Sequence, residues 1–319
     1  MIVQEQSILS ELNRQKVLIT GISGSLGKLL ANRLCDQFAV LGTDTRKFVR
    51  KPQAIKHLEV DLRKNSALVQ LKRAKPDHII HLGVIRNPHK HQVNSSAYYY
   101  NVEVTAQLLR LAEELNIKKF IFLSTANLYG PSATSSGFLS EDAPLHGADR
   151  SPEVRDLVAL DMMIQSFFWK HPHTETVILR PVHIVGKHLN NAPSTYLRLR
   201  TAPTLLGYDP LLQLVHESDV INALELALKN SVRGIFNIVG KSQAPLSRML
   251  QRRKISPLPT PQFLLRPLMR NLFKYKFSSY PPGEMDHLKY TCLVDGSRAK
   301  KHLGFSASLS LGATLDSLG

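Results

Sequence analysis

Three glycines, Gly21, Gly24 and Gly27, form the first pattern in the chain with recognisable chemistry. They follow the apolar run KVLIT (16–20) and precede a helical pattern, so the sequence predicts a strand, a tight turn and a helix in succession. Glycines in such a turn let the backbone come close to a pyrophosphate, and the amides that open the helix favour its negative charge. We therefore expect a phosphate-binding turn over 19–27.

A carboxylate stands where a bound adenosine would need one. The second apolar run, AVLGT (39–43), ends at Asp44, and a carboxylate there can accept hydrogen bonds from the ribose hydroxyls. Asp44 favours NAD, because it would repel the 2′-phosphate of NADP. Arg46, Lys47 and Arg50 follow closely, however, and guanidinium groups suit phosphate recognition. NAD is the first expectation, and NADP stays open.

Strand and helix patterns alternate along the first two-thirds of the chain. The expected buried strands are KVLIT (16–20), AVLGT (39–43), HIIHLG (78–83), KFIFLST (119–125), TVILRP (176–181) and GIFNIVG (234–240). Their continuous apolarity is typical of parallel strands covered on both faces, with amphipathic helices between them. The sequence therefore predicts an α/β fold, a doubly wound parallel sheet of the Rossmann type.

The alternation loosens after Arg180, where the expected domain organisation changes. We expect a dinucleotide-binding Rossmann domain over 14–181, to which 212–240 returns, and a smaller substrate or lid region made of 182–211 and 241–319. Within that region, 187–210 is rich in Asn, Pro and Thr and is typical of a loop with a short helix.

The chain is strongly basic, with a formal net charge of +16 and a pI near 9.9. From Ser242 to Gly283 there is no Asp or Glu, while Lys and Arg contribute eight positive charges. The stretch QFLLRPLMRNLFKYKF (262–277) mixes apolar and cationic side chains in the way of a helix lying on anionic lipid. A lid helix packed on the sheet explains the same pattern. No nucleic-acid module surrounds these charges, so no nucleic-acid partner is expected.

Cysteine content and hydropathy indicate a cytoplasmic protein. The chain has only Cys35 and Cys292, far apart and without metal-ligand spacing, so we expect reduced thiols and no metal site. No apolar run approaches the roughly 20 residues that span a bilayer. The first fifteen residues lack the basic and apolar regions of a signal peptide.

The spacing G-x-x-G-x-x-G resembles that of the extended short-chain dehydrogenase/reductase superfamily, the NAD-dependent epimerase/dehydratase family. The further stretches that resemble family motifs, in order, are VDL (60–62), HLG (81–83), NVEVT (101–105), STANLYG (124–130), LRPVHIVG (179–186), VHESDV (215–220) and DGSRAKKHLGF (295–305). The resemblance extends from about Lys16 to Leu315 and is specific at the level of the superfamily.

This resemblance implies a nicotinamide dinucleotide cofactor and a set of residues around it. Asp61 matches an acidic residue that contacts the adenine amine, and Thr125 falls on the catalytic Ser/Thr position. The expected cofactor-binding residues are Gly21, Ser23, Gly24, Ser25, Leu26, Gly27, Asp44, Arg46, Asp61, Leu62, Leu82, Gly83, Asn101, Ser124 and Pro181.

One departure from the family pattern concerns the chemistry itself. The family uses Y-x-x-x-K on the helix that corresponds here to PEVRDLVALDMMIQSFF (152–168). The Tyr position falls near 153–154 and the Lys position at 157–158, and 131–195 contains no tyrosine at all. The acid–base pair that dehydratases place after the Thr is also absent, since Ala126 and Asn127 stand there. The resemblance therefore implies an atypical active site.

Other side chains could supply the missing proton donor. His183 lies in the turn after the strand 176–181, close to where the family holds the nicotinamide, and histidine titrates near neutral pH. A hydrogen-bonded loop histidine is the alternative. One of Tyr98, Tyr99 and Tyr100 could also reach the site, although aromatic residues at helical positions usually pack. Thr125 could orient a substrate hydroxyl but is too weak an acid to replace a tyrosine.

Two functions remain open on these grounds. The first is an NAD(P)-dependent oxidoreductase or epimerase-like enzyme that acts on a nucleotide sugar or a similar polar or anionic small molecule. The second is a dinucleotide-binding sensor or scaffold without catalysis. Relatives in this superfamily often dimerise through the two helices that flank the STANLYG strand, so a homodimer is a further expectation.

Overall fold

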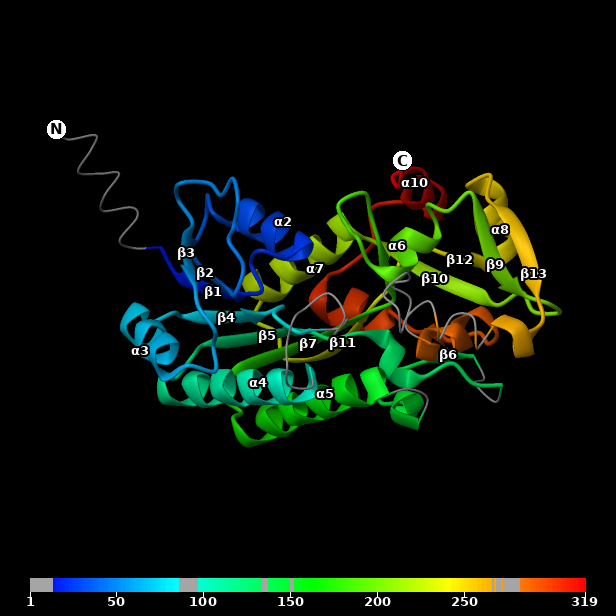
Figure 1. The fold of residues 1–319 in the computed structure, drawn as a ribbon. Helices are drawn as coiled ribbons and strands as arrows, with labels where there is room; N and C mark the ends of the chain where they lie inside the picture. Colours follow the sequence, from blue (N-terminus) through cyan, green and yellow to red (C-terminus); the bar gives the residue numbers. More distant parts are fainter. Residues whose placement is uncertain are drawn as a thin grey trace.

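A seven-stranded parallel sheet forms the centre of the protein (Figure 1). The computed structural model describes residues 14–85, 97–133, 137–149, 152–265, 267, 271 and 282–319. In spatial order the strands are β11 (Gly234–Ile238), β7 (Glu175–Pro181), β5 (Lys119–Leu123), β4 (His78–His81), β1 (Lys16–Thr20), β2 (Ala39–Asp44) and β3 (Lys56–Glu59). All neighbouring strands run parallel, which confirms the predicted doubly wound α/β fold.

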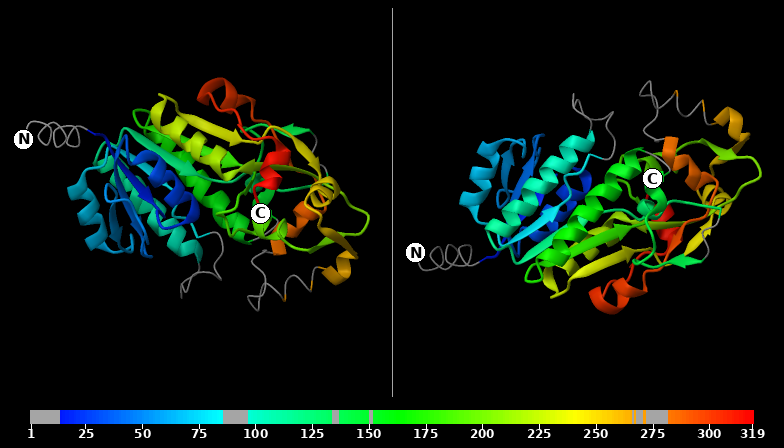
Figure 2. Two further views of the ribbon diagram at one scale, coloured as in Figure 1. Left: turned by 90° about the horizontal axis from the view of Figure 1, so that it is seen from above. Right: turned by 90° about the horizontal axis from the view of Figure 1, so that it is seen from below.

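Helices cover both faces of this sheet, as the continuous apolarity of the strands requires. On one face lie α2 (Ser25–Leu34) and α7 (Glu217–Lys229), and on the other lie α3 (Asn65–Ala74), α4 (Ala97–Glu114) and α5 (Pro152–Lys170) (Figure 2). Side chains of one strand alternate between the two cores: Val17 and Ile19 face α2 and α7, whereas Leu18 packs with the α3–α5 layer. Each large apolar side chain so buried stabilises the fold by about 1.5–3 kcal/mol.

Edge strand β3 has no counterpart among the expected strands. Its sequence KHLE is short and mostly polar, and its residues are exposed or half-buried. It pairs only with β2, through a register that places Glu59 beside Asp44. An edge strand needs no apolar run because one side and part of its faces meet water, so periodicity alone does not identify it.

Three small sheets lie outside the large one. In the first, β10 (Leu211–His216) pairs with β12 (Gln243–Pro245) and with β8 (His183–Val185), and in the second, β13 (Ser256–Thr260) pairs with β9 (Thr201–Leu205); these strands belong to a core of the C-terminal region. In the third, β14 (Leu293–Val294) pairs with β6 (Phe138–Leu139) and packs against the core of the large sheet. The short helices are η2 (Ala126–Tyr129), η3 (His146–Asp149), α6 (Ala192–Tyr196), α8 (Leu246–Arg252), η4 (Pro282–Leu288), η5 (Ala299–Leu303) and α10 (Leu311–Asp316). The expected loop over 187–210 therefore contains α6, as predicted, and also β9.

The chain crosses between the two regions several times. β7 leads directly into β8, and α7 with β11 returns to the large sheet, whereas β10 belongs to the second region. Figure 1 shows the second region beyond one end of the large sheet, on the side where its strands end. Among the described residues, no helix is both long enough and apolar enough to cross a membrane.

Candidate functional site

The turn after β1 holds the three predicted phosphate-binding glycines, and each has different surroundings. Gly21 has a φ of 70°, and a Cβ built on it would lie 2.7 Å from Cα of Gly83. A Cβ on Gly27 would lie 2.4 Å from the carbonyl oxygen of Gly21. On Gly24 it would come no closer than 3.1 Å to any atom, and the next neighbour is the Arg46 guanidinium at 3.8 Å. Gly21 and Gly27 are required by the close approach of backbone atoms. Gly24 has fewer neighbours, and no side chain of its own covers the outer face of the turn.

Helix α2 starts directly after this turn with uncapped amides. Gly24 is its N-cap residue and has no side chain to accept a hydrogen bond, and the first turn of α2 contains no acidic residue. The first intrahelical hydrogen bond is donated by Lys28 to the Gly24 carbonyl (2.9 Å), which leaves the N–H groups of Ser25, Leu26 and Gly27 without intrahelical partners. Such a helix end carries partial positive charge and suits a phosphate group.

Asp44, at the end of β2, is tied to the glycine turn. Its Oδ2 accepts a hydrogen bond from the backbone N–H of Ser23 (3.1 Å), and the Ser23 hydroxyl donates to the carbonyl of Arg46 (2.8 Å). Arg46 covers Asp44 with two further hydrogen bonds, from Nε to Oδ1 and from Nη2 to Oδ2, both 3.1 Å. The hydrogen bond to Asp44 raises the pKa of Arg46. The predicted ribose-binding carboxylate is therefore fixed in place and paired with the predicted phosphate-binding cation.

Asp61, the predicted adenine contact, and Leu62, another predicted cofactor-binding residue, are buried to different extents. The Asp61 carboxylate forms a two-point ion pair with Arg63, at 2.7 Å from Nη2 to Oδ2 and 3.2 Å from Nε to Oδ1, and this lowers the pKa of Asp61. Leu62 is buried in the core between the sheet and the α3–α5 layer. The Arg63 guanidinium lies 5.0 Å from the centre of the Tyr100 ring. Only Asp61 of this pair presents a polar group at the surface.

The three tyrosines considered as proton donors lie on the first turns of α4. Burial raises the pKa of Tyr100 to about 12, which makes its phenol a weaker acid than a free tyrosine. Tyr99 is 67% exposed, and the ring of Tyr98 packs edge-on against it at 5.5 Å. Burial therefore makes Tyr100 a poor replacement acid, and Tyr99 is directed largely to solvent.

The end of β4 is connected to β1 by a buried hydrogen-bond chain. The Gly83 N–H donates to Oγ1 of Thr20 (3.1 Å), which also bonds to Nδ1 of His81 (2.7 Å). Nε2 of His81 bonds to Oγ1 of Thr105 on α4 (3.1 Å). His81 is therefore a buried structural residue, which sets the position of Leu82 and Gly83 beside the glycine turn.

Asn101 uses its amide group inside the protein. Its side-chain N–H donates to the Ile85 carbonyl and its Oδ1 accepts the Ile85 N–H, both at 2.9 Å. The side chain is buried, so these two bonds fix the chain segment that follows β4. Asn101 is a predicted cofactor contact, and in the structure both ends of its amide are bonded to Ile85.

Ser124 and Thr125 follow β5 and have separate partners. The Ser124 hydroxyl donates to Oδ2 of Asp161 on α5 (2.5 Å). Oγ1 of Thr125 accepts the N–H of Asn127 (3.2 Å) and so caps the short helix η2. Because Thr125 acts there as an acceptor and is only half-buried, its hydroxyl proton remains available to donate outward.

Asp161 and Arg180 form a buried ion pair that the sequence did not single out. Arg180 Nη2 lies 2.6 Å from Oδ1 of Asp161, and the two side chains are 1% and 0% exposed. Nη1 of Arg180 donates to the Tyr129 hydroxyl (3.0 Å), which donates to Oδ1 of Asn237 (2.8 Å). The one signal in the sequence was Asp161 itself, a charged residue within the mostly apolar helix pattern of 152–168. The sequence does not indicate that Arg180 is its partner.

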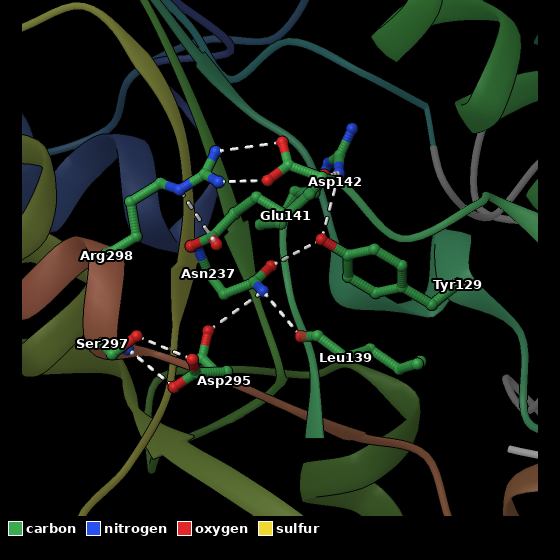
Figure 3. A network of polar contacts seen from close by, with 9 residues as sticks. Tyr129, Leu139, Glu141, Asp142, Asn237, Asp295, Ser297 and Arg298 are labelled. Atoms are coloured by element: carbon green, nitrogen blue, oxygen red, sulfur yellow. Dashed lines mark hydrogen bonds and ion pairs between the residues drawn. The ribbon is translucent and has the colours of Figure 1, made fainter. Parts of the chain in front are cut away.

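The same network continues to the C-terminal segment (Figure 3). Asn237 donates from its backbone N–H to Oε1 of Glu141 (2.8 Å) and from its amide to the Asp295 carbonyl (3.1 Å). Arg298 pairs with both Glu141 and Asp142. The stretch 295–305 is thereby fastened to the loop that follows β6, and the ends of β5, β7 and β11 are held in one relative position.

His183, the predicted proton donor, lies at the start of β8, directly past Pro181 and Val182. Its imidazole meets that of His287 on η4 edge-on, with ring centres 4.7 Å apart. Desolvation lowers the pKa of His183 to about 4, and that of His287 also lies well below its usual value. At neutral pH both rings are uncharged, so His183 can donate one N–H or accept one proton but cannot act as an imidazolium acid.

The first half of α5, where the sequence motifs predict the position of the family's catalytic pair, presents mainly apolar side chains. Leu157 packs on the core beneath the sheet, and Val158 is buried. Val154 packs against Gly147 of η3, and Arg155 donates to the Ala148 carbonyl. The side chain of Glu153 lies outside the described residues. The sequence of α5 has no tyrosine, and its one lysine, Lys170, ends the helix.

The predicted cofactor and substrate residues at the strand ends lie along one edge of the large sheet, because parallel strands end at the same edge. The glycine turn, Asp44, Gly83, Thr125 and Pro181 directly follow or end β1, β2, β4, β5 and β7, which are all parallel. In open α/β sheets, ligands bind beyond this carboxyl edge. Among the described residues, no three His, Cys, Asp or Glu side chains gather as metal ligands, and both cysteines are free thiols.

Comparison with known proteins agrees with this geometry. A curated relative, an uncharacterized protein of Mycobacterium tuberculosis, is 23% identical over 297 residues, which span 91% of this chain and 79% of the relative. UDP-glucose 4-epimerase of Thermotoga maritima superposes with a TM-score of 0.75 at 17% identity, over 95% of this chain and 97% of that one. UDP-glucuronic acid 4-epimerase of Bacillus cereus, in complex with NAD, has a TM-score of 0.71 at 20% identity, with the same coverage of both chains.

The sequence itself identifies the family. The model of the NAD dependent epimerase/dehydratase family matches residues 17–239, which include the glycine turn and every strand of the seven-stranded sheet. This confirms the resemblance found from the motifs: the chain belongs to the NAD dependent epimerase/dehydratase family.

Proposed function

We propose that this protein binds NAD across the carboxyl edge of its sheet and acts as an oxidoreductase of the epimerase/dehydratase type. The observation that carries the proposal is the start of α2 beside Gly24. Within 4 Å of the Gly24 Cβ position lie only the Gly21 carbonyl oxygen (3.1 Å) and the Arg46 guanidinium (3.8 Å), next to three N–H groups of α2 that have no intrahelical partner, and such a turn is the cradle that a diphosphate requires. Asp44, bonded to Ser23 of the same turn, would accept the hydroxyls of the adenosine ribose.

Arg46 makes NADP the second candidate cofactor. Its side chain is 53% exposed and lies 3.8 Å from the Cβ position of Gly24, so it borders both the ribose and the phosphate positions. When a ribose engages Asp44, the Arg46 guanidinium can move off the carboxylate toward solvent. A 2′-phosphate would instead need Arg46 as its partner while meeting the negative charge of Asp44, so NAD is the better fit.

Two side chains would then act on the substrate. NAD when bound supplies a hydride acceptor, and the chain must position the substrate hydroxyl whose carbon is oxidised. Thr125 can donate its hydroxyl proton to a substrate oxygen, because its own oxygen already accepts from Asn127. Uncharged His183 would accept the proton of the substrate hydroxyl as the hydride leaves, in place of the tyrosine that the Tyr-x-x-x-Lys helix provides elsewhere.

The substrate class follows from the relatives and from charge. The structure of the Thermotoga epimerase was obtained with UDP-glucose, and we propose a nucleotide sugar or a similar polar anion for this chain. A net charge of +16 would attract such an anion.

The alternative is a protein that binds the cofactor without turnover, and the apolar side chains of α5 support it. Apolar Leu157 and buried Val158 stand where the family places a lysine, so no ammonium group would contact the nicotinamide ribose. In that case bound NAD would set the conformation of the C-terminal region, because β7 leads directly into β8.

An activity assay separates the two. The protein would be mixed with NAD and with UDP-glucose or UDP-glucuronic acid, and reduced cofactor and epimerised sugar would be measured. Turnover that falls in Thr125→Val and His183→Gln, but not in the control His171→Gln at the end of α5, supports the enzyme. NAD binding with no turnover on any sugar supports the alternative.

A further inference from the structure

An apolar surface lies at the end of the protein remote from the nucleotide-binding half of the sheet. Leu206, Leu258, Phe263 and Leu264 are 60%, 55%, 75% and 53% exposed. In Figure 1 the strands that carry or adjoin them, β9 and β13, lie at the opposite end of the molecule from α3. With Tyr208, these residues are here called the distal apolar surface.

Hydrogen bonds and a cation–π contact join the segments that carry this surface. The Leu206 N–H donates to the Thr260 carbonyl (3.1 Å), which joins the end of β9 to the end of β13. Gln262, next to Phe263, accepts a hydrogen bond from Nζ of Lys289 (2.9 Å). The same ammonium lies 5.2 Å from the centre of the Tyr208 ring.

Buried neighbours in the sequence fix the position of the distal apolar surface. Leu205 and Leu265 are buried in the core of the C-terminal region, whereas their neighbours Leu206 and Leu264 face water. The exposed side chains are therefore held outward by folded structure. Leucine and phenylalanine exposed together in this way mark an interaction site more often than a neutral surface.

Described cations stand close to the surface. Lys289 lies within it, and Arg248, Arg252, Arg253 and Lys254 lie in α8 and the turn that leads into β13. Part of the stretch 242–283 (266, 268–270 and 272–281) lies outside the described residues. Asp286 precedes Lys289 by three residues, and its carbonyl accepts the Lys289 N–H (3.1 Å). The nearest acidic side chain along β9–β10, Asp209, accepts two hydrogen bonds from Ser247 and is held on the α8 side.

We propose that the distal apolar surface docks on an anionic lipid membrane, with Phe263 and Leu264 entering the boundary between headgroups and acyl chains. Cations beside protruding apolar side chains are the combination that binds such a boundary. Lipid needs no matching shape, whereas a protein partner requires a complementary, well-packed contact. This goes beyond the proposed enzymatic function and does not depend on it.

Vesicle sedimentation tests the docking directly. The full chain should pellet with phosphatidylcholine vesicles that contain phosphatidylserine, pellet poorly with phosphatidylcholine alone, and be released by high salt. Phe263→Ser/Leu264→Ser should lower the partition coefficient at least about tenfold, because two inserting side chains are lost. The matched control Met162→Ser/Trp169→Ser removes two exposed apolar side chains from α5 and should pellet like the wild type.

A fluorescence reporter gives an independent readout of depth. Trp169 is the one tryptophan in the chain, so Phe263→Trp in a Trp169→Phe background places a single reporter on the surface. Its emission should shift to the blue when phosphatidylserine vesicles are added, while Trp169 in the wild type should not respond.

Three results would overturn the proposal. They are no pelleting of the wild type with anionic vesicles, equal pelleting of the Phe263/Leu264 variant, and an unshifted reporter. Concentration-dependent self-association that disappears in the same variant, without vesicle binding, would assign the surface to a second copy of the chain instead.

Discussion

The guanidinium of Arg46 meets both oxygens of the Asp44 carboxylate, with Nε 3.1 Å from Oδ1 and Nη2 3.1 Å from Oδ2. Asp44 is also bonded to the backbone of Ser23, so the pair joins the end of β2 to the glycine turn. Any ribose that binds Asp44 must replace the Arg46 contacts. This relationship makes the choice between NAD and NADP a property of two adjacent side chains.

Asp44→Asn should weaken NAD binding by about tenfold or more, because a charged hydrogen bond to a ribose hydroxyl becomes a neutral one. NADP binding should fall less or rise, since the repulsion of the 2′-phosphate is removed. Titration calorimetry with both cofactors measures the ratio. Asp36→Asn, at the far end of α2, is the control and should leave both affinities unchanged; an unchanged ratio in Asp44→Asn would contradict the assignment.

Gly24→Ala should separate binding from folding. The residue has an extended backbone (φ −71°, ψ 165°), and its new methyl group would lie 3.1 Å from the Gly21 carbonyl oxygen, so the turn must shift slightly and thermal stability should fall less than in Gly27→Ala. Affinity for the dinucleotide should fall at least about tenfold, since the methyl occupies the phosphate position. A variant that keeps the wild-type affinity would show that no phosphate approaches Gly24.

Gly27→Ala is the matched comparison for stability. Its Cβ would lie 2.4 Å from the carbonyl oxygen of Gly21 and 2.7 Å from Cα of Ile22, so backbone must move. We expect a loss of about 1–3 kcal/mol in the free energy of unfolding, measured by urea denaturation. Equal stability of the Gly24 and Gly27 variants would contradict the different surroundings of the two glycines.

Asp161→Ala should be the most destabilising substitution considered. It leaves the Arg180 guanidinium buried without its carboxylate, which costs about 3–5 kcal/mol. Asp316→Ala breaks the exposed pair with Arg252 and should leave the free energy of unfolding almost unchanged, because solvent screens that pair. If Asp161→Ala does not fold, Ser124→Ala provides a milder test, with an expected loss of about 1 kcal/mol from one hydrogen bond to Asp161. Similar losses in Asp161→Ala and Asp316→Ala would contradict the buried network.

His183 should make the protein less stable in acid. Its pKa is lowered to about 4 in the folded protein, against an ordinary value of 6.5, so the unfolded chain binds more protons between these values. Stability should therefore fall by about 2 kcal/mol from this group as the pH drops from about 7 to about 5. Urea denaturation of His183→Gln across this range should show a shallower decline. An identical decline in wild type and variant would show that His183 is not desolvated.

Much of the fold could be predicted because its signals are local. Runs such as KFIFLST and TVILRP are apolar throughout, as strands covered on both faces must be, and the glycine turn fixed the order strand, turn, helix. β3 and β9 could not be predicted, since KHLE and TAPTL are short, and polar or proline-containing, and owe their pairing to neighbours far along the chain.

The sequence indicated candidate site residues but not the contacts of their side chains. The end of the second apolar run indicated Asp44 and a family motif indicated Asn101, yet the amide of Asn101 is engaged by Ile85 and the carboxylate of Asp44 by Arg46. The environment of His183 depends on His287, more than a hundred positions later, and sequence spacing carries no information about such a contact.

Calorimetric titration of the purified protein with NAD tests whether the dinucleotide binds at the glycine turn. We expect one site per chain, with a higher affinity for NAD than for NADP. In Gly24→Ala this affinity should be lost while the variant still unfolds in one thermal transition. Failure of both dinucleotides to bind the folded wild-type protein, or binding that Gly24→Ala and Asp44→Asn leave intact, would contradict this expectation.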